Sequence, residues 1–260
     1  MSDTTVMGDI VRELGGQSEG EGTVVLNTGA ALRSDVPDEL GRRMRATIVL
    51  LGALLARFGR ARVPRPGGDD IGARRFEQHL RGLRQMGAHI TETNDEIVAT
   101  ADELHGDRIV FDLPTVTGTE NILLAAVKAH GRTEIFNAAR EPHVQDLCGL
   151  LVKMGAHIEG IGTERLIVDG TQELGGAEHT VVADYLEAGT YAIAAAAAGG
   201  TARRTSSCSS SSSSRPEPTS RPETDGFGLG GRRGRRSSRS ICRRGRFPAF
   251  PPTFRRSTWP

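Results

Sequence analysis

The chain has 260 residues, three cysteines and a formal net charge of +1. This length allows one large domain or two modest ones, each with an apolar core. The cysteines are far apart and lack metal-ligand spacing, which excludes a disulfide framework and favours a reducing, cytoplasmic compartment. No apolar run reaches the roughly 18 residues that a membrane helix needs, and residues 1–10 do not resemble a signal peptide, so we predict no membrane partner.

The net charge hides a sharp division near residue 200. Residues 201–260 contain 14 arginines, no lysine and three acids, a charge of +11, so residues 1–200 carry −10. The basic segment starts with a serine run and is rich in Arg, Pro and Gly, a composition that cannot bury a core. We interpret it as a low-complexity tail, disordered or translated out of frame. The alternative is a basic tail for nucleic acid, which the absence of lysine disfavours.

An internal repeat occupies residues 1–200. The pentapeptide Met86–Ile90 recurs unchanged as Met154–Ile158, 68 residues later. An apolar segment that ends at Gly59 recurs with Gly131, 72 residues later, and Leu14-Gly15-Gly16 is a candidate for a degraded copy of the pentapeptide. A fixed period of this kind is typical of repeated structural units.

Each repeat predicts the same order of elements. Apolar residues at spacings of three and four predict helices that end at a glycine, and short alternating runs after the glycine predict strands. In chain order we expect a helix ending at Gly59, a helix over 74–86, strands over 88–92, 96–100, 107–112 and 133–136, a helix over 144–154, and strands over 156–159 and 165–168. The chain is therefore predicted to be an α/β protein with units of about 70 residues.

The most unusual segment is Pro66-Gly67-Gly68-Asp69-Asp70-Ile71-Gly72-Ala73-Arg74. Its glycines let the backbone approach a ligand, and Arg74 at the start of a helix could bind a phosphate together with backbone N–H groups. A carboxylic acid in the same loop could donate a proton. The alternative is a surface turn in which Asp69 or Asp70 caps the helix.

Two more segments combine polar residues with a predicted helix start. Residues 115–121 (Thr-Val-Thr-Gly-Thr-Glu-Asn) suit an anion at a helix N-terminus, or simple capping by Thr117 or Thr119. Residues 137–142 follow a strand, and Arg140 and Glu141 could form a structural ion pair. The seven histidines show no metal-binding pattern, and dinucleotide and Walker motifs are missing, so we predict no metal and no cofactor.

Taken together, these residues resemble the enolpyruvyl transferases, and within them the branch that acts on UDP-N-acetylglucosamine. The resemblance covers nearly all of residues 3–200. The matching pieces are Met44–Ala46, Leu55–Gly59, Pro66–Arg74, Gly82-Leu83, Met86–Ala88, Thr119–Ile122, Asn137–Pro142, Met154–Ala156, and Asp184 with Glu187–Thr190.

The resemblance implies a fold and a reaction. The fold is an inside-out α/β barrel of βαβαββ units in two domains, with the substrates between them. In the reaction the sugar 3-hydroxyl attacks C2 of phosphoenolpyruvate while an acid protonates C3, and phosphate then leaves. This is the first committed step of peptidoglycan synthesis. The related alternatives are transfer to 3-phosphoshikimate and a non-catalytic protein that binds a nucleotide sugar.

The resemblance also assigns roles to individual residues. Asp69 takes the position of the acid, which is usually cysteine in the family. Arg74 is the implied phosphate anchor. The remaining implied substrate-binding residues are Arg45 in the cleft, Arg75, Glu77, Gln78 and His79 at the uridine end, and Thr115, Val116, Thr117 and Gly118 at the diphosphate. Arg75, usually proline, and His143, usually acidic, depart from the family pattern.

The same comparison predicts the domain organisation. Residues 1–183 correspond to one domain without its first strand and its lysine–asparagine loop, and residues 184–200 to the start of the second domain. Residues 201–260 fall outside the resemblance. Because the second domain supplies the aspartate base in the family, we expect the 260-residue chain by itself to have little activity.

Overall fold

The computed structural model describes residues 3–20, 23–28, 33–68, 76–171 and 173–198, and the backbone of residues 202–203 and 226–227. The chain divides into two compact units, residues 1–182 and residues 183–260, and each is described by itself. Among the described residues, no helix has the length and apolar character needed to cross a membrane.

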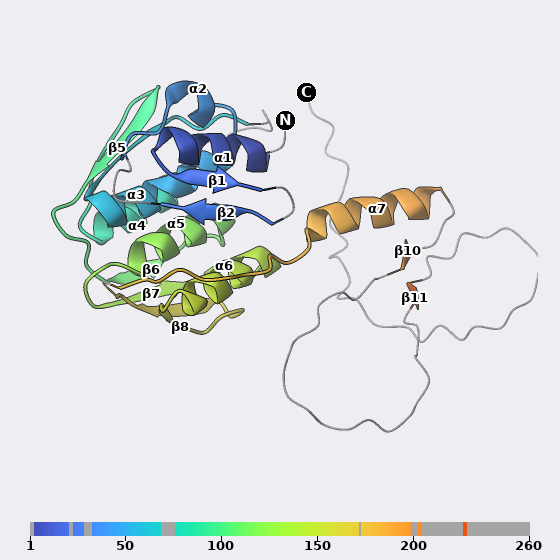
Figure 1. The fold of residues 1–260 in the computed structure, drawn as a ribbon. Helices are drawn as coiled ribbons and strands as arrows, with labels where there is room; N and C mark the ends of the chain where they lie inside the picture. The colour runs from blue at the N-terminus through green and yellow to red at the C-terminus, as the bar shows by residue number, and fades with distance from the viewer. Residues whose placement is uncertain are drawn as a thin grey trace, which may run out of the picture. The chain divides into compact units, whose positions relative to one another are not determined.

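The first unit alternates helices with short strands (Figure 1). Its helices are α1 (Asp3–Glu13), α2 (Asp38–Gly41), the 3-10 helix η1 (Arg45–Val49), α3 (Leu50–Phe58), α4 (Glu77–Gln85), α5 (Val116–Ala126) and α6 (Pro142–Lys153). Its strands are β1 (Gln17–Glu19), β2 (Val25–Asn27), β3 (Arg60–Pro64), β4 (His89–Glu92), β5 (Glu96–Thr100), β6 (Arg108–Val110), β7 (Arg132–Phe136), β8 (His157–Glu159) and β9 (Arg165–Asp169).

The strands of this unit form three sheets. Strands β1 and β2 make a hairpin, a second sheet has the order β3-β5-β4, and a third has the order β6-β7-β9-β8. Strands β6 and β7 are parallel, and the other pairs are antiparallel. Across the part of the chain that the structure describes, no sheet closes on itself, so the α/β content is confirmed and the expected barrel is not seen.

The repeat read from the sequence is confirmed in the backbone. Gly87 and Gly155 both have a positive φ, +102° and +107°, which ends the preceding helix at a conformation that favours glycine. The next residue but one then starts a strand in each copy: His89 is paired with Thr100, and His157 with Asp169. The two copies therefore share helix, turn and strand register.

Residues 14–16 prove to be a third copy of the same turn. Helix α1 precedes them, Gly15 has a φ of +99°, and the β1–β2 hairpin follows. The pentapeptide has diverged at this place, but the requirement for a glycine after the helix has not changed.

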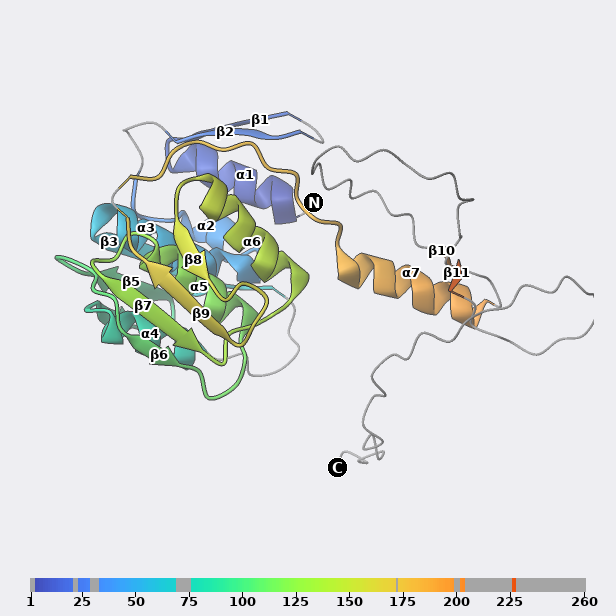
Figure 2. The ribbon, with the colours of Figure 1, turned by 90° about the horizontal axis from the view of Figure 1, so that it is seen from below.

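Helix α5 lies at the centre of the first unit. Figure 1 shows α3, α4 and α5 between strand β5 and strands β6, β7 and β8, and in Figure 2 α5 lies near the middle of the unit. Apolar residues cover α5 on most sides, and Ile122, Leu123, Ala125 and Ala126 are completely buried. A helix with so wide an apolar surface requires neighbours on several sides, and α5 packs against α3, α4 and α6.

Several element boundaries differ from those expected. The helix predicted over 144–154 begins earlier, at Pro142, because proline fits the first helical turn. The strand predicted over 107–112 is limited to β6, since the backbone N–H of Asp112 donates to the Gln78 side chain at 2.7 Å. Helix α4 is described from Glu77, and residues 69–75, which include its expected start, lie outside the described residues.

The second unit contains helix α7 (Tyr185–Ala197). The Asp184 carboxylate caps it by accepting hydrogen bonds from the N–H groups of Leu186 and Glu187 at 2.8 and 3.4 Å. Two-residue strands β10 (Ala202–Arg203) and β11 (Gly226–Phe227) pair in antiparallel fashion. The other residues of the predicted tail lie outside the described residues.

Candidate functional site

The glycine-rich loop after β3 is described as far as Gly68. Gly67 packs against the backbone of Arg42 so closely that a Cβ would lie 1.8 Å from the Arg42 carbonyl oxygen, and Gly68 has a φ of +97°. Both positions therefore require glycine. The predicted acid Asp69 and the predicted phosphate ligands Arg74 and Arg75 lie outside the described residues.

Arg45, the first residue of η1, lies against the start of α4. The carbon at the centre of its guanidinium group is 4.1 Å from the centre of the Phe76 ring, and Phe76 directly precedes α4. A cation over an aromatic face is attracted by the ring quadrupole, which holds the guanidinium beside the N-terminal end of α4. Gly68 approaches the backbone of Arg45 from the near end of the glycine-rich loop.

Three of the four residues predicted at the uridine end are described, and their surroundings differ. Glu77 is exposed, whereas Gln78 accepts hydrogen bonds from the N–H groups of Asp112 and Leu113 and donates to the Leu113 carbonyl at 3.3 Å. The Gln78 side chain therefore holds the segment that follows β6. His79 is 2 % exposed and faces α5.

Burial is the main reason that His79 is neutral. Loss of solvent, together with the smaller effect of the positive charge of Arg45, lowers its pKa from 6.5 to about 4. His79 Nε2 lies 3.5 Å from the Thr117 hydroxyl, and its Nδ1 lies 3.4 Å from the Asn121 side-chain nitrogen. The structure thus brings Arg45, His79 and Thr117 together.

The segment predicted to receive the diphosphate forms the first turn of α5. Thr115 is the N-cap, and its hydroxyl accepts a hydrogen bond from the Gly118 N–H at 3.3 Å. Capping by Thr117 or Thr119 was therefore the wrong assignment, because the helix starts earlier. The N–H groups of Val116 and Thr117 have no acceptor within the helix by its geometry, so this turn keeps the partial positive charge that attracts anions.

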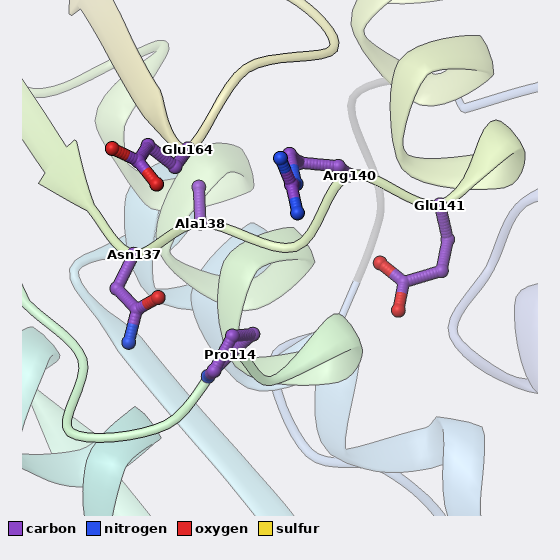
Figure 3. A pocket seen from close by; sticks show the side chains of 6 residues that line it. All are labelled: Pro114, Asn137, Ala138, Arg140, Glu141 and Glu164. Atoms are coloured by element: carbon purple, nitrogen blue, oxygen red, sulfur yellow. The ribbon is translucent and has the colours of Figure 1, made fainter. Parts of the chain in front are cut away.

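A pocket of about 380 Å³ opens beside this turn. Figure 3 shows the six residues that line it, with Pro114 across from Glu164 and Arg140. The lining residues are Pro114, Asn137, Ala138, Arg140, Glu141 and Glu164. Asn137 adopts a φ of +58°, uncommon for a residue with a side chain, and donates to the Phe111 carbonyl at 3.1 Å. The lining combines a cation with carboxylates and an amide, a set suited to polar, hydroxyl-bearing ligands.

A half-buried acid pair, Glu120 of α5 and Glu141 at the start of α6, was not expected from the sequence. Burial, together with the smaller effect of the nearby charge of Glu141, raises the pKa of Glu120 to about 7. One carboxylate oxygen of Glu141 is buried without a hydrogen-bond partner, and Glu120 lies 3.8 Å from the His143 ring nitrogen. The sequence signal for Glu120 was that it is the only charged residue of α5.

Comparison with known proteins places this fold. Residues 1–206 match the sequence profile of a family described as EPSP synthase (3-phosphoshikimate 1-carboxyvinyltransferase). The enolpyruvyl transferase NikO from Streptomyces tendae is similar, with a TM-score of 0.64 and 25% identity over 75% of this chain and 47% of that one.

EPSP synthase from Acinetobacter baumannii has a similar fold, with a TM-score of 0.58 and 20% identity over 75% of this chain and 45% of that one. The chain thus spans about half the length of these solved structures. The profile match covers most of the sequence and includes the glycine-rich loop, η1 and the first turn of α5. The chain therefore belongs to the EPSP synthase family of enolpyruvyl transferases.

Proposed function

We propose that this chain binds UDP-N-acetylglucosamine and phosphoenolpyruvate as part of an enolpyruvyl transferase of peptidoglycan synthesis in the cytoplasm. The sequence of the loop from Pro66 to Arg74 supports this branch of the family. The single observation that carries the proposal is the proximity of Arg45, His79 and Thr117: His79 contacts Thr117 and lies within the electrostatic range of Arg45. It joins the segments to which the resemblance assigns the cleft, the uridine and the diphosphate.

The electrostatics of this region support an anionic ligand. The Arg45 guanidinium lies at the start of α4, and the first turn of α5 presents backbone N–H groups. Residues 1–200 carry a net charge of −10, so the guanidinium and these N–H groups would supply a local positive field within an acidic segment. Thr115, Val116, Thr117 and Gly118 would contact the diphosphate, and Arg75, Glu77, Gln78 and His79 would lie at the uridine end.

The chemistry proposed for the loop is acid catalysis. The sugar 3-hydroxyl attacks C2 of phosphoenolpyruvate, Asp69 delivers a proton to C3, and the hydroxyl proton passes to a base. Phosphate then leaves C2 of the tetrahedral intermediate, with Arg74 as its anchor, while a proton returns from C3 to a base, so that the C2–C3 double bond of the enol ether is restored. Asp69 can donate a proton if partial burial raises its pKa so that the protonated form is populated.

The complete site requires more than the matched half of the fold. The base comes from the second domain in the family, and the inside-out barrel implied by the resemblance needs strands beyond those described. The position of α3, α4 and α5 between strand β5 and strands β6, β7 and β8 supports that arrangement (Figure 1). We therefore propose ligand binding without turnover for the 260-residue chain.

A second candidate is transfer to 3-phosphoshikimate. The description of the matching family profile and the similar structure from Acinetobacter baumannii favour it. The two candidates differ in the ligand: a nucleotide sugar carries a diphosphate and a uracil ring, whereas 3-phosphoshikimate is a small phosphorylated ring.

Calorimetric titration of the 260-residue chain with both ligands tests these proposals. We expect binding of UDP-N-acetylglucosamine and none of 3-phosphoshikimate; the reverse result would establish the second candidate. Arg74→Gln should abolish phosphoenolpyruvate binding in the presence of the nucleotide sugar. The matched control is Arg84→Gln, which changes an exposed arginine of α4 and should bind normally. Phosphate release by the isolated chain would contradict the proposal that it does not turn over.

A further inference from the structure

One buried amide connects the three segments of the candidate site. Asn121 has no exposed surface and lies in α5. Its side-chain oxygen accepts a hydrogen bond from the Gly52 N–H at 2.6 Å, and its nitrogen donates to the Ile48 carbonyl at 3.0 Å. The same nitrogen lies 3.4 Å from His79 Nδ1. The amide therefore joins η1, which begins at Arg45, and α3 to α4 and α5.

The Gly52 contact fixes which way this amide faces. A backbone N–H can only donate, so the atom of Asn121 that faces Gly52 must be the oxygen. The nitrogen then faces both the Ile48 carbonyl and His79, and its two hydrogens match these two acceptors. A side chain at position 52 would prevent this arrangement, since a Cβ would lie 2.5 Å from the Asn121 oxygen.

The orientation of Asn121 determines the tautomer of His79. An amide nitrogen offers only donors, so His79 Nδ1 must be the acceptor and carry no proton. In a neutral imidazole the proton is then on Nε2, and His79 is neutral because burial holds its pKa near 4. The Nε2–H faces the hydroxyl oxygen of Thr117 at 3.5 Å.

The direction of that last hydrogen bond matters for a ligand. If Nε2–H donates to Thr117, the threonine hydroxyl hydrogen is left to donate elsewhere. With the opposite tautomer, the hydroxyl would donate to His79 and present a lone pair to an anion, which is repulsive. The 3.5 Å separation between His79 Nε2 and the Thr117 oxygen is long, as is common in ligand-free sites. We expect it to shorten when the Thr117 hydroxyl donates its hydrogen bond to an anion.

We infer that Asn121 and His79 are positioning residues, which orient the Thr117 hydroxyl as a hydrogen-bond donor to a diphosphate oxygen of the ligand. This inference rests on the proposed function for the ligand, whereas the order of hydrogen bonds rests on the contacts alone. The order is Gly52 N–H to Asn121, Asn121 to His79, His79 to Thr117, and Thr117 to the ligand.

The tautomer is measured first. Long-range proton–nitrogen NMR of the ¹⁵N-histidine-labelled 260-residue chain reports which ring nitrogen carries the proton, and the signal missing in His79→Phe assigns the residue. We expect the proton on Nε2. A proton on Nδ1 would overturn the inference, whether or not the chain binds a ligand.

Titration with UDP-N-acetylglucosamine then measures the donor role. Thr117→Val should weaken binding about tenfold, and Thr117→Ser, which restores the hydroxyl, should lie within about twofold of wild type. Thr133→Val is the matched control, because Thr133 is buried in β7 and its hydroxyl has no partner. It should bind like wild type.

A double-mutant cycle separates positioning from a general structural role. Asn121→Asp should invert the hydrogen bonds of His79 and weaken binding about tenfold, but have no further effect in the Thr117→Val background. His79→Phe serves the same cycle if the aspartate variant does not fold. Additive effects in a folded double variant would overturn the inference. Wild-type chain that binds no nucleotide sugar would contradict the proposed function, and the NMR result alone would then decide the order of hydrogen bonds.

Discussion

The two well-preserved repeats of the first unit share a frame but differ in the loop that precedes their second helix. Strands β3, β5 and β4 have the same order and pairing as β7, β9 and β8. The offset between equivalent residues falls from 72 at Gly59 and Gly131 to 68 at Gly87 and Gly155. The extra residues of the first repeat lie between β3 and the end of α4, where the candidate acid occurs. The frame is thus conserved for packing, and the candidate chemistry is carried by the longer connection.

The second helices of the two repeats show the same contrast in their side chains. At the common offset, Leu80 and Leu83 of α4 correspond to Cys148 and Leu151 of α6, and all four are buried. His79, which contacts the candidate site, corresponds to Leu147, an apolar residue packed against the core. The same helix position therefore holds an apolar packing residue in the second repeat and a polar residue of the candidate site in the first.

The largest expected effect concerns the shared core position. Leu80→Ala should lower the free energy of unfolding by about 3 kcal/mol, because it removes a large side chain that is 1 % exposed and leaves a cavity. The equivalent Cys148→Ala removes one sulfur atom and should cost about 1 kcal/mol. Urea denaturation followed by circular dichroism measures both. Equal costs would show that the two helices do not occupy equivalent places.

A smaller effect distinguishes Glu120 of α5 from His79 of α4, because their contributions to the free energy of unfolding change with pH in opposite directions. Glu120 has a raised pKa when folded, so the folded chain binds its proton more tightly than the unfolded chain between about pH 4.5 and 7. The contribution of Glu120 to stability therefore falls as the pH rises through this window. His79 has a lowered pKa, and its contribution rises from about pH 4 to 6.5.

Glu120→Gln removes the pH-dependent contribution of Glu120 to stability and leaves that of His79. Relative to wild type, the variant should gain about 2 kcal/mol of stability between pH 4.5 and 7, after allowance for partial exposure of the carboxylate. Urea denaturation of variant and wild type at pH 4.5 and pH 7.5 measures this difference in the free energy of unfolding. A constant difference between variant and wild type across this range would contradict the raised pKa.

The smallest effect compares the starts of α5 and α6. Thr115 caps α5 with its hydroxyl, whereas Glu141 at the start of α6 makes no side-chain capping hydrogen bond. Thr115→Ala should cost about 1 kcal/mol, and Glu141→Ala should cost nothing or stabilise, since it removes a buried oxygen without a partner. Thermal unfolding of both variants tests this, and a larger loss for Glu141→Ala would show that its carboxylate has a partner in solution.

The frame was predictable from the sequence because its signals are local. The repeated Met-Gly-Ala-His-Ile identified two helix ends and two strand starts, since a glycine of positive φ is required wherever that turn occurs. Strand β5 was predicted with its observed bounds. The helix starts were harder, because Pro142 and Thr115 begin their helices before the apolar periodicity becomes visible.

The candidate site was predictable only in part, because its contacts join distant segments. Arg45, His79 and Thr117 were expected to bind substrate, but nothing local indicates that Asn121 connects α5 to η1 and α3. The pKa of Glu120 likewise depends on burial and on Glu141, twenty-one residues further along the chain. Such properties arise from the packing of helices rather than from spacing within one segment.

The contact between α3 and α5 has a consequence for how the family can vary. Position 52 must lack a side chain because Asn121 occupies the space that a Cβ would need, and Asn121 requires the Gly52 N–H to orient its amide. The nearest atom to such a Cβ is the backbone carbonyl oxygen of residue 121, at 2.2 Å, which every residue has, so replacing Asn121 would not make room at position 52. In an alignment of relatives, position 52 should therefore be glycine whichever residue stands at 121.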